Sequence, residues 1–100
     1  MTEGPPSLTA VREGIDAIDQ EMVRLLAARS VLVRAAAAFK PDSTVDGGKA
    51  VRAPERVEQV VARVRALAAD AGLEPDVAEA TWRAMIERFI AVELQAQRRR

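Results

Sequence analysis

The chain contains neither cysteine nor histidine. Without cysteine it can form no disulfide and no thiolate metal site. Without histidine it lacks the commonest general base and the commonest zinc ligand. No phosphate-binding glycine loop, zinc-ligand spacing or catalytic triad appears either. Any chemistry must therefore use carboxylates, lysine, arginine and amides.

Net charge and long apolar runs are also missing. Lys plus Arg and Asp plus Glu each number 15, and without the terminal run Arg98–Arg100 the body is slightly acidic. We therefore expect no nucleic-acid partner. No apolar stretch approaches the ~20 residues of a membrane span, so we expect no membrane partner. The N-terminal MTEGPP lacks the charged and apolar regions of a secretory signal. We expect a soluble cytoplasmic protein.

The chain is rich in alanine and poor in aromatic residues, which favours helix over strand. Apolar residues alternate three and four apart and predict one long helix over residues 8–39. The polar segment 41–52 contains two glycines and predicts a mobile loop. Two shorter helices follow, from Pro54 to a cap at Gly72 and from Pro75 toward Arg98. We predict one all-α domain over residues 1–100, with three helices and with disordered ends at 1–7 and 98–100.

The predicted long helix exceeds the size of a globule built from this chain alone. Some 32 residues span about 48 Å at 1.5 Å per residue. A compact domain of 100 residues is only about 35 Å across. Because the apolar stripe runs along the whole helix, something else must cover it. A second copy of the chain is the economical answer, so we expect a helical homodimer.

Charged residues interrupt the apolar stripes at two places, Arg29 and Glu93, and Lys40 shares a face with the first of them. Arg29 takes the seam position between Leu25 and Leu32, where a cation is costly unless an anion meets it. Lys40 lies about 20° around the helix from Arg29 and about 16 Å further along it, so both could reach one anion. Glu93 lies on the apolar face of the last helix. It is either ionised and paired with Arg29 or Lys40, or protonated and donating a hydrogen bond.

Two further cations fit an anion site less directly. Arg12 lies about 25 Å before Arg29 on the same helix, so it can serve the same pocket only from an antiparallel partner chain. Arg56 lies near a helix N-terminus, which adds a positive end of its own. Each cation also has a structural explanation. Arg29 could snorkel or form a structural bridge, Lys40 could compensate a helix dipole, and Arg12 and Arg56 could be solvated.

The segments VREGIDAIDQEMVRLLAARSVLV, AAFK and APERVEQVV resemble the all-helical chorismate mutases, especially the related isochorismate-pyruvate lyase. The likeness covers residues 8–97. Its most specific part is the R-x2-I-D-x2-D start, followed by Arg29, then Phe39-Lys40, then Pro54-Glu55-Arg56.

The resemblance implies an intertwined homodimer with two active sites, in which Arg29, Lys40 and Arg56 act from one chain and Arg12 from the other. It implies a dicarboxylate substrate whose enolpyruvyl ether rearranges to prephenate, and no cofactor, metal or covalent intermediate. Catalysis would be electrostatic, with Lys40, Glu93 and Arg29 as catalytic residues. The expected substrate-binding residues are Arg12, Arg29, Lys40, Arg56, Val57 and Phe89.

The chain departs from that family at three places. Glu93 stands where the family often has Gln, so we expect Glu93 to need its proton and activity to rise toward acid pH. Val57 and Ala53 stand where many mutases have Glu and Asp. Segment 41–52 is longer than the matching loop of the lyase and is a candidate lid. Isochorismate-pyruvate lyase, 4-amino-4-deoxychorismate mutase and a non-enzymatic helical dimer that binds a partner remain as alternatives.

Overall fold

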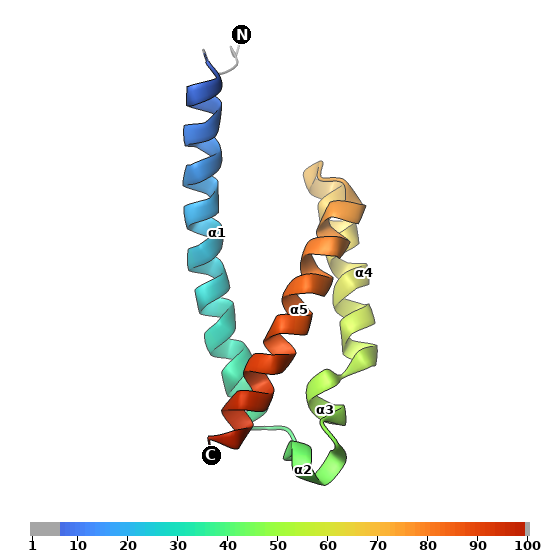
Figure 1. The fold of residues 1–100 in the computed structure, drawn as a ribbon. Helices are drawn as coiled ribbons and strands as arrows, with labels where there is room; N and C mark the ends of the chain where they lie inside the picture. The colour runs from blue at the N-terminus through green and yellow to red at the C-terminus, as the bar shows by residue number, and fades with distance from the viewer. Residues whose placement is uncertain (1–6, 100) are drawn as a thin grey trace. The chain divides into compact units, whose positions relative to one another are not determined.

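A computed structural model describes residues 7–99 of the chain, which form five helices joined by short turns (Figure 1). They are α1 (Leu8–Ala37), α2 (Ser43–Asp46), α3 (Lys49–Arg52), α4 (Pro54–Ala71) and α5 (Pro75–Arg98). Over this range there is no strand, which confirms the all-α prediction. The predicted count of three helices is wrong, because two one-turn helices join the three long ones. The chain divides into two compact units after Leu32.

The first unit contains the beginning of α1. Ser7 caps this helix, since its Oγ accepts a hydrogen bond from the backbone N–H of Ala10 at 3.0 Å. Large apolar side chains along the helix are exposed within the single chain, with Ile18 at 62% and Leu32 at 71%. The predicted apolar stripe is therefore present on this helix.

The second unit begins with the last turns of α1. The helix ends at Ala37 rather than at the predicted residue 39. Beyond it, the N–H groups of Phe39 and Lys40 bond to carbonyls three residues back, at 3.0 and 3.3 Å. Pro41 explains this ending, because a proline disfavours helical geometry in the residue before it and tightens the last turn.

Helices α4 and α5 run antiparallel beside each other and hold the core of the second unit (Figure 1). Val64, Ala68 and Ala78 are buried between them, and Val60 and Trp82 pack against this cluster. The connection turns at Gly72, whose positive φ of 81° suits glycine, and the N–H of Leu73 bonds back to the carbonyl of Ala68. The predicted cap at Gly72 and helix start at Pro75 are confirmed.

Segment 41–52 is not the loop that its composition predicts. Asp42 caps α2 by accepting from the N–H of Thr44 at 2.8 Å. Asp46 accepts from the N–H groups of Gly48 and Ala50 at 2.8 and 3.1 Å and so connects α2 to α3. The glycines between them adopt φ values of 69° and 81°. Aspartate caps and left-handed glycines thus build two single turns that are too short to show a helical period.

The predicted disordered ends need a correction. Ser7 is placed and caps α1, while Arg98 belongs to α5 and Arg99 caps its end. Residues 1–6 and 100, where the rest of that prediction falls, lie outside the described residues.

Candidate functional site

Lys40 and Glu93 form a close ion pair in the second unit. The Lys40 ammonium donates to Oε2 of Glu93 at 2.6 Å, and only 25% and 11% of the two side chains are exposed. Lys40 comes from the turn after α1 and Glu93 from the last third of α5. This is one of the pairings that the sequence left open. A partly buried pair of this kind holds a positive charge in a place where water screens it poorly.

Gln97 lies one helical turn after Glu93 and is the most buried polar residue of α5, at 3% exposure. Its amide binds the backbone on both sides of Lys40: the oxygen accepts from the N–H of Ser43, and the nitrogen donates to the carbonyls of Ala37 and Pro41. Sequence reasoning missed this residue. Its spacing of four from Glu93 was the available signal, but an amide near a helix end is ordinary.

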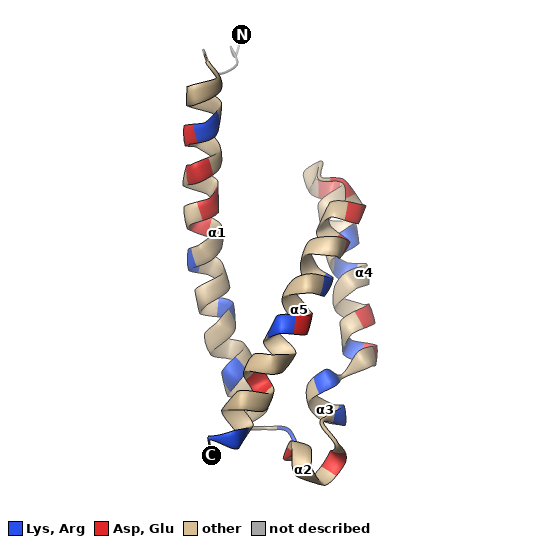
Figure 2. Ribbon diagram, viewed as in Figure 1, with Lys and Arg blue, Asp and Glu red and all other residues tan. Residues whose placement is uncertain are grey.

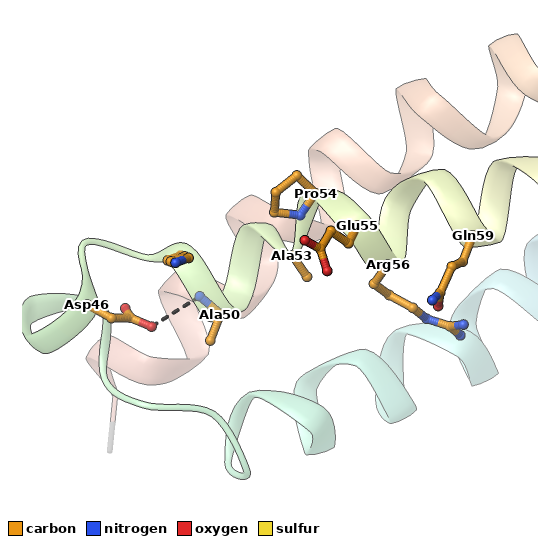
Figure 3. Close-up of a pocket in the computed structure, with 8 residues that line it drawn as sticks. Asp46, Ala50, Ala53, Pro54, Glu55, Arg56 and Gln59 are labelled. Carbon is orange, nitrogen blue, oxygen red and sulfur yellow. Dashed lines mark hydrogen bonds between the residues drawn. The ribbon is translucent and has the colours of Figure 1, made fainter.

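Arg56 lies in the first turn of α4 and lines a separate pocket with a volume of about 600 Å³ (Figure 3). In the close-up, Arg56 and Gln59 extend from the same side of α4. The remaining lining residues are Asp46, Lys49, Ala50, Ala53, Pro54 and Glu55. No side chain caps the N-terminus of α4, so its positive end adds to the two cations of the pocket. Asp46 and Glu55 offset part of that charge.

The other expected site residues lie as follows. Val57 is half-buried beside Arg56 in the first turns of α4, and Phe89 is half-buried one turn before Glu93 on α5. Neither lines the Arg56 pocket. Arg29 and Arg12 both belong to the first unit, where Arg29 is half-buried and Arg12 is exposed. The structure thus joins Lys40 to Glu93 directly, and gives no such contact between Arg56 and either of them.

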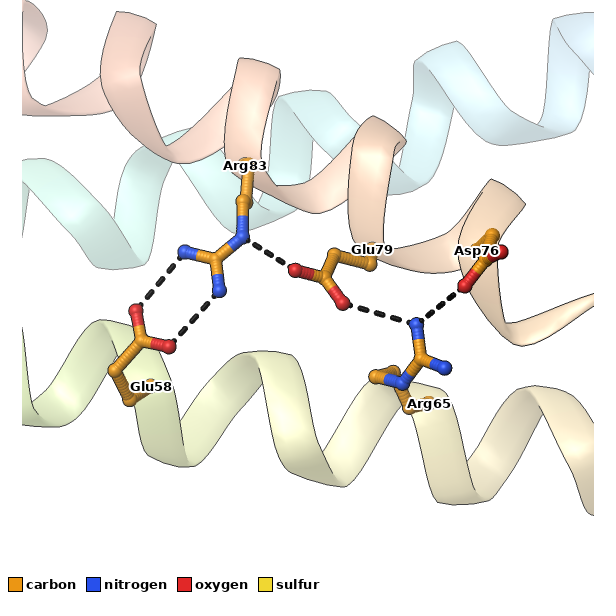
Figure 4. A network of polar contacts seen from close by, with 5 residues as sticks. All are labelled: Glu58, Arg65, Asp76, Glu79 and Arg83. Carbon is orange, nitrogen blue, oxygen red and sulfur yellow. Dashed lines mark hydrogen bonds and ion pairs between the residues drawn. The ribbon is translucent and has the colours of Figure 1, made fainter.

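A network of charged side chains links α4 to α5, the two antiparallel helices that carry Arg56 and Glu93 (Figure 4). We call these two helices the hairpin. Both terminal nitrogens of Arg83 bond to Glu58, at 2.9 and 2.8 Å, and its Nε bonds to Glu79 at 2.7 Å. Arg65 continues the chain to Glu79 and Asp76. The hydrogen bonds from Arg83 lower the pKa of both Glu58 and Glu79. Because all five side chains lie at the surface, we interpret the network as a support for the hairpin.

Charges of both signs are distributed along α4 and α5 (Figure 2). Even so, no group of three acidic side chains within residues 7–99 is arranged to hold a metal ion. None of the described helices combines the length and the apolar character needed to cross a membrane.

The fold and these charges define an all-helical protein with a lysine–carboxylate centre. A family model described as chorismate mutase type II matches residues 11–94. The chain therefore belongs to the chorismate mutase type II family, as its sequence predicts. Membership implies a chorismate-like substrate and does not by itself distinguish a mutase from a lyase. None of the curated proteins compared with the chain matches it significantly.

Proposed function

We propose that the chain is a chorismate mutase, which rearranges chorismate to prephenate. The reaction breaks the ether C–O bond and forms a C–C bond within one molecule, so it needs no cofactor, metal or covalent intermediate. The enzyme has to hold the folded substrate and stabilise the charge that grows on the ether oxygen. The observation that carries the proposal is Lys40, a cation held at low exposure by α5 in a chain of this family.

Lys40 supplies the positive charge for the ether oxygen. Its ammonium contacts Glu93, which aims it and compensates the cost of burying it. An ammonium has three N–H donors on a flexible stem, so it can turn from Glu93 toward a bound ether oxygen. Removal of one preorganised donor of this kind typically costs 10²–10³-fold in rate, equivalent to about 3–4 kcal/mol.

Glu93 acts beside it in its protonated form. An ionised carboxylate would repel the ether oxygen of the transition state, whereas a carboxylic acid can donate a hydrogen bond to it. With substrate bound, the Lys40 ammonium turns toward the ether oxygen, and Glu93 acts as the acid beside it. The proposed activity therefore rises as the pH falls.

The substrate carboxylates are bound by arginines. In our proposal Arg29 and Arg56 act from one chain, Arg12 reaches in from a second copy, and the half-buried Val57 and Phe89 form the apolar walls. Arg56 is supported by its position in a pocket at the uncapped start of α4. The contribution of Arg12 from the partner chain rests on the length of α1.

The exposed stripe of α1 supports the second copy. Large contiguous apolar surfaces are rare on monomers and mark protein–protein contacts. The exposed apolar residues of α1 are Leu8, Val11, Ile15, Ile18, Met22, Val23, Leu25, Leu26, Val31 and Leu32. A homodimer that buries this stripe would also bring each Arg12 to the other chain. The single-domain organisation and the cytoplasmic location stay predictions from the sequence.

Two related substrates form the second candidate. Ala53 lines the Arg56 pocket, and Val57 follows Arg56 directly, where many mutases carry acidic residues for the substrate hydroxyl. This apolar character is shared by the lyase-like relatives and favours isochorismate, with elimination of pyruvate to salicylate. The substrate with an amine in place of the hydroxyl, 4-amino-4-deoxychorismate, is a further alternative. A non-enzymatic dimer that binds a protein partner is the remaining alternative.

Product analysis with the purified full chain tests these assignments. Chorismate, isochorismate and 4-amino-4-deoxychorismate are supplied separately, and the product of each is identified by chromatography. Prephenate as the fastest product supports the proposal, and faster release of salicylate and pyruvate would assign the lyase. An intact dimer that turns over none of the three would favour the partner-binding protein.

A further inference from the structure

The amide of Gln97 holds the backbone on both sides of Lys40. Its oxygen accepts from the N–H of Ser43 at 3.0 Å, and its nitrogen donates to the carbonyls of Pro41 at 3.0 Å and Ala37 at 3.3 Å. A glutamine amide has two N–H donors and one carbonyl acceptor. Both N–H donors and one of the two acceptor sites of this side chain are therefore used.

Two of these three backbone groups lie at the ends of helices. Ala37 ends α1 and Ser43 begins α2, so both lie at helix ends, where backbone groups lack intrahelical partners. Pro41 has no N–H, so the backbone here cannot complete a regular ladder. The carbonyl of Ala37 also accepts from the N–H of Lys40 at 3.3 Å. Gln97 and the Lys40 backbone thus meet at the same oxygen.

Helix α5 contacts this turn at two points four residues apart. Glu93 binds the Lys40 ammonium at 2.6 Å, and Gln97 binds the backbone from which that side chain extends. Both residues are buried, at 8% and 3% exposure, and positions four apart lie on the same face of a helix. The contact with Glu93 is to the end of the lysine side chain, whereas the contacts with Gln97 are to the backbone.

We infer that Gln97 is a positioning residue for Lys40. The inference rests on the proposed function and deepens it. When substrate draws the ammonium away from Glu93, Gln97 keeps the origin of the lysine side chain fixed, so the ammonium reaches the ether oxygen without a search. A misplacement of about 1 Å at a catalytic group can cost on the order of 10² in rate.

The test compares Gln97→Met with Gln95→Leu, a change to an apolar residue at an exposed position of the same helix. Methionine keeps the length of the side chain and removes all three hydrogen bonds. We expect kcat to fall by a factor on the order of 10² in Gln97→Met, with KM changed less than about threefold. Gln95→Leu should match the wild type.

Two further variants separate positioning from lost stability. Val64→Ala removes volume from the α4–α5 core, far along the chain from Lys40, and provides a similarly destabilised reference. It should keep its kcat at a temperature where it is folded. In Gln97→Glu the introduced carboxylate is ionised near neutral pH, so it accepts hydrogen bonds but cannot donate to the two carbonyls. The protonated carboxyl regains one donor. The rate of this variant relative to wild type should therefore recover as the pH is lowered.

An amide NMR spectrum gives a readout that does not depend on turnover. In Gln97→Met the Ser43 N–H should shift and lose its protection from hydrogen exchange, while Gln95→Leu leaves it unchanged. An active wild type together with an unimpaired kcat in Gln97→Met would overturn the inference alone. A fall in Val64→Ala as large as that in Gln97→Met would also overturn it. A wild type inactive on all three substrates would overturn the proposed function and this inference with it.

Discussion

Replacement of Glu93 by glutamine changes the charge at the centre of the proposed site and little else. In the wild type the carboxylate accepts from Lys40 at 2.6 Å and its side chain is 11% exposed. The amide oxygen of glutamine can still accept from the ammonium, so one hydrogen bond is kept and one negative charge is lost. Breaking a fully buried ion pair costs about 3–5 kcal/mol. Because Lys40 is 25% exposed and keeps an acceptor, we expect a smaller loss, about 1–2 kcal/mol of unfolding free energy.

Although Glu93→Gln should lower the stability of the fold, it should raise turnover at alkaline pH. If the wild type reacts only with a proton on Glu93, its kcat should fall as the pH is raised across an assay range of about pH 5 to pH 8. The amide introduced by Glu93→Gln carries N–H donors at every pH, so the profile of this variant should be flat over that range and should exceed the wild type at its alkaline end. Glu87→Gln, an exposed site on the same helix, is the matched control and should keep the wild-type profile.

The test measures steady-state rates and chemical denaturation for the wild type, Glu93→Gln and Glu87→Gln. A wild-type kcat that is constant over this pH range would refute the proton requirement. A Glu93→Gln variant that is folded but inactive throughout would refute it as well, because the amide should replace the protonated carboxyl.

The remaining predictions concern the shared site, backbone strain and the charge network. Arg12→Ala and Arg29→Ala should each be inactive, yet mixed subunits should regain activity, because one of the two sites in a heterodimer would carry neither substitution; no recovery after confirmed subunit exchange would count against a shared site. Ala53 has a positive φ of 39°, which strains an alanine backbone, so Ala53→Gly should stabilise the fold by about 1 kcal/mol in urea unfolding. A lower urea midpoint in Ala53→Gly would contradict backbone strain at this residue. Arg83 lowers the pKa of Glu58 and Glu79, so its contribution to stability is present above their unfolded pKa and is lost as the pH falls through the lowered values. Arg83→Met should therefore reduce Tm at neutral pH and change it little at about pH 2. Equal Tm shifts at both pH values would exclude this link between protonation and stability.

The long helices could be predicted from the sequence because each carries many periods of its apolar pattern. The spacing of α1, the cap at Gly72 and the start at Pro75 all rest on local rules that the structure follows. The helices α2 and α3 could not be predicted in this way. Each has four residues, and their stability comes from the side chains of Asp42 and Asp46 rather than from a repeated apolar position.

For a similar reason, only part of the candidate site could be predicted from the sequence. Glu93 stood out because a charge on an apolar face needs a partner, and Lys40 was one of the two cations expected to meet it. Gln97 carries no charge and lies near a helix end, where polar residues are common. Its role depends on contact between the end of α5 and the turn after α1, and the spacing of residues along α5 does not predict that contact.

The most direct test of the account is the kcat of Lys40→Met on chorismate, measured beside Arg34→Met. Both substitutions remove a cation near the end of α1, but Arg34 is exposed and lies outside the Lys40–Glu93 pair. We predict a loss on the order of 10²–10³ in Lys40→Met and a near wild-type rate in Arg34→Met, with both proteins folded. Equal rates in the two variants would contradict the central role of Lys40.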